Sequence, residues 1–204
     1  MELIYKYFPE IKEEQKESLN QLLELYQEWN QKINVISRQD MQNFYERHVL
    51  HSLAISKVIQ FKKDDRIIDV GTGGGFPGVP LAIIFPESQF VLNDSIRKKL
   101  KVIEEIASVL DLKNIKTIHS RAEDISDKFD FIVSRAVTNL PRFIKMTKHL
   151  CKAGNSRKNG LYYLKGGDFS DELKKIKMAF RQFELRTFFE EDFFDTKKIV
   201  YLAY

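Results

Sequence analysis

From residue 65 onward, short apolar runs alternate with longer segments in which apolar positions recur every three or four residues. The short runs have the length of buried strands and are Arg66–Val70, Gln89–Asp94, Ile115–His119, Phe129–Ser134 and Leu161–Lys165. The segments between them predict helices over Val79–Phe85, Arg97–Leu110, Leu140–Cys151 and Asp171–Phe180. This alternation predicts an α/β fold whose sheet is mostly parallel and has helices on both faces.

The two ends of the chain have other patterns. Near the C-terminus, the apolar-rich runs Glu184–Phe189 and Lys198–Leu202 are joined by an acidic loop, which predicts an antiparallel hairpin at the sheet edge. Near the N-terminus, one apolar stripe recurs at a spacing of three and four and consists of Leu19, Leu22, Leu23, Tyr26, Trp29 and Ile33. A second helix is predicted over Met41–Ile59. These helices must pack on each other and on the sheet, so we expect a helical extension over residues 1–62 and a core domain over residues 63–204.

A glycine-rich turn follows the first predicted strand. Asp69 stands near the end of that strand, four of the five residues in Gly71–Gly75 are glycine, and a helix is predicted soon after Pro77. Glycine permits positive φ and lets a ligand approach the backbone closely. A helix N-terminus favours a negatively charged group. We therefore interpret this stretch as the cradle of a nucleotide-type cofactor.

Two cofactors are compatible with this turn. Gly73, Gly75 and Gly78 match the G-x-G-x-x-G fingerprint of dinucleotide binding, which alone is a weak signal. Read from Asp69, the same residues match D-x-G-x-G-x-G, which resembles motif I of S-adenosylmethionine-dependent methyltransferases. Asp94 ends the next strand, where the ribose hydroxyls of either cofactor favour a carboxylate. Asp69 favours S-adenosylmethionine, because a pyrophosphate gains nothing from a nearby carboxylate.

Composition narrows the class of protein. The chain has 204 residues, of which 43% are hydrophobic and 12% aromatic, enough for one substantial domain with its own core. A single cysteine permits no internal disulfide, and no apolar run has the length of a signal or membrane-spanning segment. We therefore expect a cytoplasmic protein, and a monomer. The net charge of +4 permits an anionic partner without requiring one.

Three of the five predicted strands are followed or ended by a basic residue, namely Arg121, Arg135 and Lys165. Ligands of open α/β sheets bind at the carboxyl ends of the strands. We expect these side chains to face one crevice, with Arg135 as the strongest candidate. The alternative for Arg135 is an anchor that holds the N-terminal helices through an acid such as Glu46.

Absent motifs narrow the methyl acceptor. Enzymes that methylate exocyclic amines of DNA commonly carry an Asn/Asp/Ser-Pro-Pro-aromatic tetrapeptide after the fourth strand, where this chain has Ser134–Val137. Methylation of a pyrimidine carbon needs a thiolate, and Cys151 lies away from the strand ends. A ring nitrogen such as guanine N7 already has a lone pair and needs positioning rather than a general base. His48 and His51 share one side of a helix but have no third ligand at a sensible spacing, so we expect no metal.

These motifs together resemble the glucose-inhibited division protein B family, the bacterial small-subunit ribosomal RNA guanine-N7 methyltransferases. The resemblance rests mainly on Asp69–Leu81. Shorter matches are Asn34–Ser37, Arg47-His48, Asp94-Ser95, Lys98, Arg121–Glu123, Ser134–Ala136 and Leu164–Gly166. The resemblance implies a class I methyltransferase-like Rossmann sheet, S-adenosylmethionine as cofactor, and methyl transfer to N7 of a guanine in 16S ribosomal RNA. A dinucleotide-dependent oxidoreductase and a non-catalytic ribosome-binding module of the same fold remain alternatives.

The motifs and the resemblance together imply specific site residues. For cofactor binding these are Asp69, Gly71, Gly73, Gly75, Phe76, Asp94, Ser95, Ala122, Glu123 and Arg135. For the RNA substrate or the methyl transfer they are Arg121, Arg135 and Lys165. For RNA binding outside the crevice we add the basic residues Lys98, Arg157, Lys158 and Lys197. The family usually has Asp at the position of His51 and Arg at that of Lys197. A lysine lacks the bidentate fork of arginine, so we expect a looser grip on phosphate there.

Overall fold

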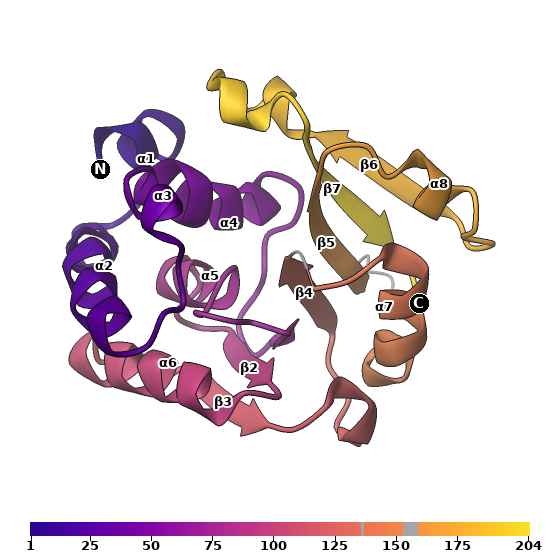
Figure 1. The fold of residues 1–204 in the computed structure, drawn as a ribbon, viewed down its shortest axis with the longest axis horizontal. Coiled ribbons are helices and arrows are strands. Elements are labelled where there is room, and N and C mark those ends of the chain that lie inside the picture. Colours follow the sequence, from indigo (N-terminus) through magenta and orange to yellow (C-terminus); the bar gives the residue numbers. More distant parts are fainter. Residues whose placement is uncertain (136, 153–158) are drawn as a thin grey trace.

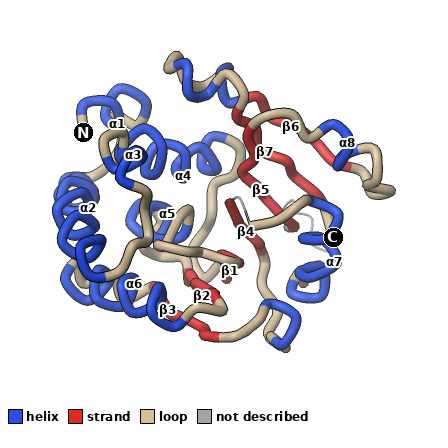
Figure 2. Tube along the Cα trace, in the orientation of Figure 1, coloured by secondary structure: helices blue, strands red, loops and turns tan. Residues whose placement is uncertain are grey.

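The computed structural model describes residues 1–135, 137–152 and 159–204, and a seven-stranded sheet forms its centre (Figures 1 and 2). The strands are β1 Arg66–Val70, β2 Gln89–Asp94, β3 Ile115–His119, β4 Phe131–Arg135, β5 Gly160–Gly166, β6 Phe180–Glu184 and β7 Lys197–Leu202. Their order is β3-β2-β1-β4-β5-β7-β6. Strands β1 to β5 pair in parallel, whereas β7 is antiparallel to both β5 and β6. The strand order reverses between β1 and β4, which is where ligands of such sheets bind.

Helices cover both faces of this sheet (Figure 1). The α-helices are α1 Glu2–Tyr7, α2 Glu13–Lys32, α3 Arg38–Met41, α4 His51–Leu53, α5 Gly78–Ile84, α6 Arg97–Val109, α7 Leu140–Thr147 and α8 Ser170–Leu173. A π-helix, η1, spans Tyr45–Leu50, and 3₁₀ turns span η2 Ala54–Lys57, η3 Ala122–Asp124, η4 Lys148–Leu150, η5 Leu185–Thr187 and η6 Asp192–Phe194. The N-terminal helices, α5 and α6 lie on one side of the sheet and α7 on the other.

The core is divided between the two faces of the sheet. Neighbouring residues of a strand alternate between them: Ile67 packs in a cluster with the N-terminal helices, and Ile68 packs in a second cluster with α7. Central strands buried on both faces have continuous apolar sequences, which is why β1 and β4 are recognisable in the sequence. The N-terminal helices share one cluster with the sheet. The domain division at residue 62 therefore stays a prediction.

The predicted fold class is confirmed, and the five parallel strands lie within two residues of their predicted bounds. The predicted helix Met41–Ile59 is wrong as one continuous α-helix. A π-helix, a turn of α-helix and a 3₁₀ turn follow one another there. In this arrangement Val49 and Leu50 are buried, while Arg47 and His48 are half-buried and contact Arg135 at the carboxyl end of β4. Such π segments occur often at functional sites.

Two predictions near the C-terminus are also wrong. The helix predicted over Asp171–Phe180 is reduced to the single turn of α8, because every second residue in Ile176–Phe180 packs on the second core cluster, a spacing of extended chain. The hairpin itself is present, but its first strand is β6 and not Glu184–Phe189. Leu185 and Phe189 are apolar because they are buried beside the N-terminal helices, where Phe189 meets the ring of Tyr7 edge-on at 4.9 Å.

Candidate active site

Asp69, within β1, organises the glycine turn from a fully buried position. Its Oδ2 accepts hydrogen bonds from Oγ1 of Thr72 at 2.7 Å and from the backbone N–H of Gly78 at 2.8 Å. These bonds tie the end of the strand to the start of α5. Burial raises the pKa of Asp69 to about 7, while the two hydrogen bonds act in the opposite direction. The side chain serves the turn and does not line either cavity described below.

Glycine is required at three positions of this turn, Gly71, Gly73 and Gly75, which all have positive φ, and the first two shape the cavity described below. Gly71 has φ +68°, and a Cβ there would lie 2.5 Å from Cγ2 of Val137. Gly73 has φ +59°, and its N–H donates to Oδ2 of Asp94 at 3.0 Å. The other oxygen of Asp94 accepts from the backbone N–H of Ile96 at 2.9 Å. The end of β2 and the glycine turn are therefore held in one fixed arrangement.

A cavity of about 340 Å³ opens between these strand ends. Its lining includes six of the residues predicted for cofactor binding, namely Gly71, Asp94, Ser95, Ala122, Glu123 and Arg135. Arg121, predicted for the RNA or the transfer step, lies in the same lining and is exposed. A volume of this size is within the range of small-molecule sites.

The residues of this cavity fit S-adenosylmethionine. The carboxylates of Asp94 and Glu123 are acceptors suited to ribose hydroxyls, and each carboxylate can accept about four hydrogen bonds. Ile96, Val137 and Met146 supply apolar surface suited to the adenine ring. The absence of a side chain at Gly71 leaves room against Val137, which any Cβ would fill. The two acceptor carboxylates, the apolar walls and this glycine agree with the predicted cofactor.

A second cavity, of about 540 Å³, lies on the other side of Arg135 and is rich in charge. Its four basic side chains are Arg47, Arg135, Lys165 and Lys197, and its two acidic side chains are Asp40 and Glu172. Asp40 pairs with Arg47 at 3.0 Å and Glu172 pairs with Lys165 at 2.7 Å. No carboxylate among the described residues forms an ion pair with Arg135 or Lys197, so the cavity has an excess of positive charge suited to an anionic ligand.

Arg135 stands between the two cavities and is held from three sides. Its Nη1 donates to the carbonyl oxygen of Arg47 at 2.8 Å, and its Nη2 donates to Nδ1 of His48 at 2.8 Å. Its guanidinium lies 5.3 Å from the centre of the Phe76 ring. Burial lowers the pKa of Arg135 to about 10, so the side chain stays charged at neutral pH. The strand end, the glycine turn and the N-terminal helices therefore meet at this side chain.

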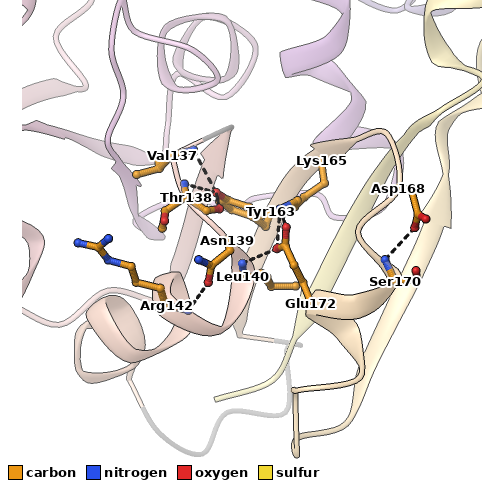
Figure 3. Close-up of polar contacts among 10 residues, drawn as sticks. All are labelled: Val137, Thr138, Asn139, Leu140, Arg142, Tyr163, Lys165, Asp168, Ser170 and Glu172. Atoms are coloured by element: carbon orange, nitrogen blue, oxygen red, sulfur yellow. Dashed lines mark hydrogen bonds and ion pairs between the residues drawn. The ribbon is translucent and has the colours of Figure 1, made fainter.

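The loop after β4 is fastened by side chains of β5 and α8 (Figure 3). The hydroxyl of Tyr163 accepts from the N–H groups of Val137 and Thr138, at 3.0 and 3.1 Å, and donates to the carbonyl of Thr138 at 2.8 Å. Glu172 accepts from the N–H of Leu140 at 2.6 Å and from Nζ of Lys165 at 2.7 and 2.8 Å. Lys165 is therefore paired with an acid and not a free cation.

The structure separates several residues that the sequence placed together. Gly73, Gly75 and Phe76, like Asp69, lie outside the lining of both cavities. Phe76 instead packs with Tyr26, Phe44 and His48 of the N-terminal helices, with ring centres 4.9 to 5.9 Å apart. Lys98 is exposed on α6, and Lys197 lines the larger cavity. Arg157 and Lys158 lie outside the described residues.

Other residues of the larger cavity were missing from the predicted site. Arg47, His48 and His51 carried one signal, because their helical spacing predicts a common side, and all three line this cavity. Asp40, Glu172 and Phe193 carried none that a single sequence reveals. Among the described residues, no three His, Cys, Asp or Glu side chains gather as a metal site would require. No helix in the described part of the chain is long and apolar enough to cross a membrane.

Comparison with solved structures defines the class of the fold. A crystal structure described as a SAM dependent methyltransferase from Aquifex aeolicus matches with a TM-score of 0.58 and 17% identity, covering 82% of this chain and 98% of that one. A mutant of MtNAS in complex with S-adenosylmethionine matches with a TM-score of 0.55 and 14% identity, covering 93% of this chain and 76% of that chain. The fold is that of the class I S-adenosylmethionine-dependent methyltransferases.

Sequence comparison gives the family. The family model for rRNA small subunit methyltransferase G matches residues 15–192. Two similar proteins are named ribosomal RNA small subunit methyltransferase G. The one from Cytophaga hutchinsonii is 52% identical, and the match covers 99% of this chain and 99% of that protein. The one from Phocaeicola vulgatus is 53% identical, and the match covers 100% of this chain and 98% of that protein. The chain belongs to the rRNA small subunit methyltransferase G family. The resemblance found in the sequence is confirmed. The glycine turn was compatible with two cofactors, and S-adenosylmethionine is the one that this family uses.

Proposed function

We propose that this protein transfers the methyl group of S-adenosylmethionine to N7 of a guanine in the 16S RNA of the small ribosomal subunit. One observation carries the proposal. Among the described residues, Arg135 alone lines both the cavity that fits the cofactor and the cavity with excess positive charge. A base in the second cavity therefore lies next to the cofactor cavity, as direct transfer between two ligands requires.

The residues that would hold the cofactor are Gly71, Asp94, Ser95, Ala122 and Glu123. Bound S-adenosylmethionine supplies a methyl group made electrophilic by its sulfonium. Guanine N7 has an in-plane lone pair and no proton, so no side chain needs to act as a base. The contribution of the protein is to position the base and to exclude water.

Arg135 orients the base without a covalent role. Methylation leaves positive charge on the guanine, so a cation against the ring face would oppose the reaction. Its contacts with Arg47 and His48 use two of the five N–H donors of the guanidinium. The remaining donors suit the O6 oxygen beside N7 or a phosphate of the same strand. Arg135 therefore favours the orientation in which N7 faces the cofactor cavity.

The RNA partner accounts for the distribution of positive charge. Arg135 and Lys197 in the larger cavity and the exposed Lys98 and Arg121 would contact phosphates. Arg157 and Lys158 remain part of the same prediction. We expect the protein to act as a monomer in the cytoplasm, where ribosomal subunits assemble.

The test uses small subunits from bacteria that lack the gene for this protein. The subunits are incubated with the protein and with S-adenosylmethionine labelled in its methyl group. We expect label in 16S RNA, and strand scission at one guanine after borohydride and aniline treatment, which is selective for 7-methylguanine. Label on another atom or another molecule, by a preparation that binds the cofactor, would contradict the proposal.

A further inference from the structure

The hydroxyl of Tyr26, in α2, reaches the glycine turn from outside the sheet. It donates a hydrogen bond of 2.5 Å to the backbone carbonyl of Gly74, and both residues are buried. Among the described residues, no backbone N–H donates to this carbonyl. A buried carbonyl without a donor destabilises a folded protein. The hydroxyl of Tyr26 therefore satisfies a group that the backbone of the turn leaves open.

The apolar stripe of α2 explains why the ring of Tyr26 is buried, but it does not explain the hydroxyl. The buried residues of this helix are Leu19, Leu22 and Tyr26, at helical spacing. The ring of Tyr26 lies 5.4 Å from that of Phe44 and 4.9 Å from that of Phe76, and a phenylalanine would make the same contacts. Burial raises the pKa of Tyr26, so the hydroxyl keeps its proton and donates. The bond to the turn is the contribution that only the hydroxyl can make.

The glycine turn is held from three directions. Asp69 fastens its two ends from within β1, and Asp94, at the end of β2, accepts from the N–H of Gly73. Tyr26 holds the next residue, Gly74, from the N-terminal helices. Because the carboxylate bonded to Gly73 lines the cofactor cavity, a displacement of Gly74 is passed through one peptide bond to the wall of that cavity.

The helices that hold the turn also form part of the larger cavity. They supply Arg47 and His48 to its wall, and the ring of Phe76, directly after the glycines, lies 4.9 Å from the rings of both Tyr26 and His48. We propose that Tyr26 is a positioning residue, whose hydroxyl holds Gly74 and with it the glycine turn in the conformation that binds S-adenosylmethionine. The inference deepens the proposed function and rests on it through the cofactor, whichever atom receives the methyl group.

The test uses Tyr26→Phe, which removes the hydroxyl and keeps the ring. If part of the free variant holds the turn in another conformation, the apparent affinity for the cofactor falls with the fraction that remains competent to bind. The loss of one buried hydrogen bond changes such an equilibrium by roughly a factor of ten. We therefore expect calorimetry to show Kd values for S-adenosylmethionine and S-adenosylhomocysteine that are about tenfold higher. In methyl transfer to small subunits, KM for S-adenosylmethionine should rise similarly, while kcat at saturating cofactor stays near that of the wild type.

Tyr45→Phe is the matched control. The hydroxyl of Tyr45 also donates to a backbone carbonyl, that of Asn20 in α2, at 2.9 Å, but this bond lies within the N-terminal helices. Tyr45 is outside the linings of both cavities. We expect Tyr45→Phe to bind S-adenosylmethionine with normal affinity, even if its melting temperature falls as much as that of Tyr26→Phe.

Hydrogen exchange reports on the turn itself. The N–H of Gly73 donates to Asp94, and the N–H of Gly75 donates to the carbonyl of Thr72 at 2.9 Å. In the wild-type protein these amides should exchange slowly even without cofactor, because the turn is already held. In Tyr26→Phe they should exchange faster, and saturating S-adenosylhomocysteine should restore their protection.

Each outcome has a defined meaning. A lower melting temperature of Tyr26→Phe with unchanged cofactor affinity would overturn the inference, because the bond would then serve stability alone. An equal loss of affinity in Tyr45→Phe would overturn it too, as would rapid exchange of the turn amides in wild-type protein without cofactor. Failure of the wild-type protein to methylate guanine N7, together with weakened cofactor binding in Tyr26→Phe, would contradict the proposed function and support the role of Tyr26.

Discussion

At the carboxyl end of β4, Arg135 and His48 are joined by a 2.8 Å hydrogen bond from Nη2 to Nδ1. With the second bond, to the carbonyl of Arg47, this contact attaches the end of β4 to the N-terminal helices. The sequence offered two interpretations of Arg135, a ligand-facing cation or an anchor through an acid such as Glu46. In the structure Arg135 contacts the N-terminal helices through a carbonyl and an imidazole, and it also lines both cavities. The two interpretations are therefore compatible.

Replacement of Arg135 is expected to lower both stability and activity. Arg135→Ala leaves the carbonyl of Arg47 and Nδ1 of His48 without this donor, so the free energy of unfolding should fall by roughly 1–3 kcal/mol. Arg135→Lys can restore one of the two bonds, so it should be less destabilised but should still lose most methyl transfer. Melting temperature and methyl transfer on both variants check this. Unchanged melting temperatures would show that the anchoring bonds contribute little.

Asp94 is expected to control cofactor affinity. Its carboxylate lines the cofactor cavity and also accepts from the N–H of Gly73, so Asp94→Ala removes a ribose acceptor and loosens the glycine turn. Bonds to charged groups contribute roughly 1.5–3 kcal/mol each, so affinity for S-adenosylmethionine should fall at least about tenfold. Titration calorimetry measures it. Asp127→Ala, which removes an acid exposed beside Arg66, is the control and should bind normally. Equal affinity of the two variants would exclude the role of Asp94.

Asp69 is expected to make stability depend on pH. Its pKa is about 7 in the folded protein against 3.8 for an unperturbed aspartate, so between these values the folded state holds a proton that the unfolded state releases. The free energy of unfolding therefore falls as pH rises from about 4 to about 7. The change is on the order of 4 kcal/mol, at about 1.4 kcal/mol per pKa unit.

The measurement compares the wild-type protein with Asp69→Asn, which keeps an acceptor for Gly78 but cannot titrate. The depressed pKa of His48 acts with the opposite sign, because its unfolded state takes up a proton below about pH 6.5. The difference in unfolding free energy between the two proteins cancels that contribution. We expect this difference to shift in favour of the asparagine variant as pH rises through the window. A difference independent of pH would contradict the buried-acid assignment.

The sequence predicted the parts of the fold that local pattern controls. Strands such as β1 are buried on both faces, so their apolar runs are nearly continuous. Asp69 and Gly71 are recognisable because the geometry of the turn requires these residue types at their positions. It failed where distant contacts decide. Phe189 was assigned to a strand because it is apolar, but its ring packs against Phe194 and against Tyr7, which is more than 180 residues away in the chain.

The same limit applied to the site. Lys165 was predicted to serve the RNA or the methyl transfer, and nothing in the sequence indicates that Glu172, seven residues later, returns to pair with it. Phe76 was placed with the cofactor because it adjoins the glycines, yet its ring faces Tyr26 and His48. Topology brings the residues that follow the strand ends to the carboxyl end of the sheet, but not to the single crevice that we expected, because Arg121 lines the smaller cavity, Lys165 the larger one and Arg135 both.

Tyr163 is expected to act as a positioning residue for the loop after β4. Tyr163→Phe leaves the N–H groups of Val137 and Thr138 without their acceptor, and Val137 lines the cofactor cavity. The loss of these two hydrogen bonds costs roughly 1–3 kcal/mol. It should reduce methyl transfer about tenfold or more, with the chemistry of the site otherwise intact. Tyr201→Phe, which removes a hydroxyl bonded to the carbonyl of Asn159, is the matched control. Equal activity of the two variants would return Tyr163 to a packing role.

Lys165 and Lys197 line the same cavity but should respond differently to neutralisation. The side chains of Lys165 and Glu172 are only 13% and 25% exposed, so Lys165→Gln leaves a half-buried carboxylate without its partner and should lower the melting temperature. Lys197 forms no ion pair with an acid among the described residues, so Lys197→Gln should leave stability nearly unchanged.

If Lys197 contacts phosphate, its loss should weaken RNA binding and reduce the slope of log affinity against log salt by about 0.7–0.9. Filter binding of small-subunit RNA at several salt concentrations, together with thermal unfolding, separates the two lysines. A steep, unaltered salt dependence in Lys197→Gln would remove that lysine from the RNA interface. An unchanged melting temperature in Lys165→Gln would show that its pairing with Glu172 contributes little to stability.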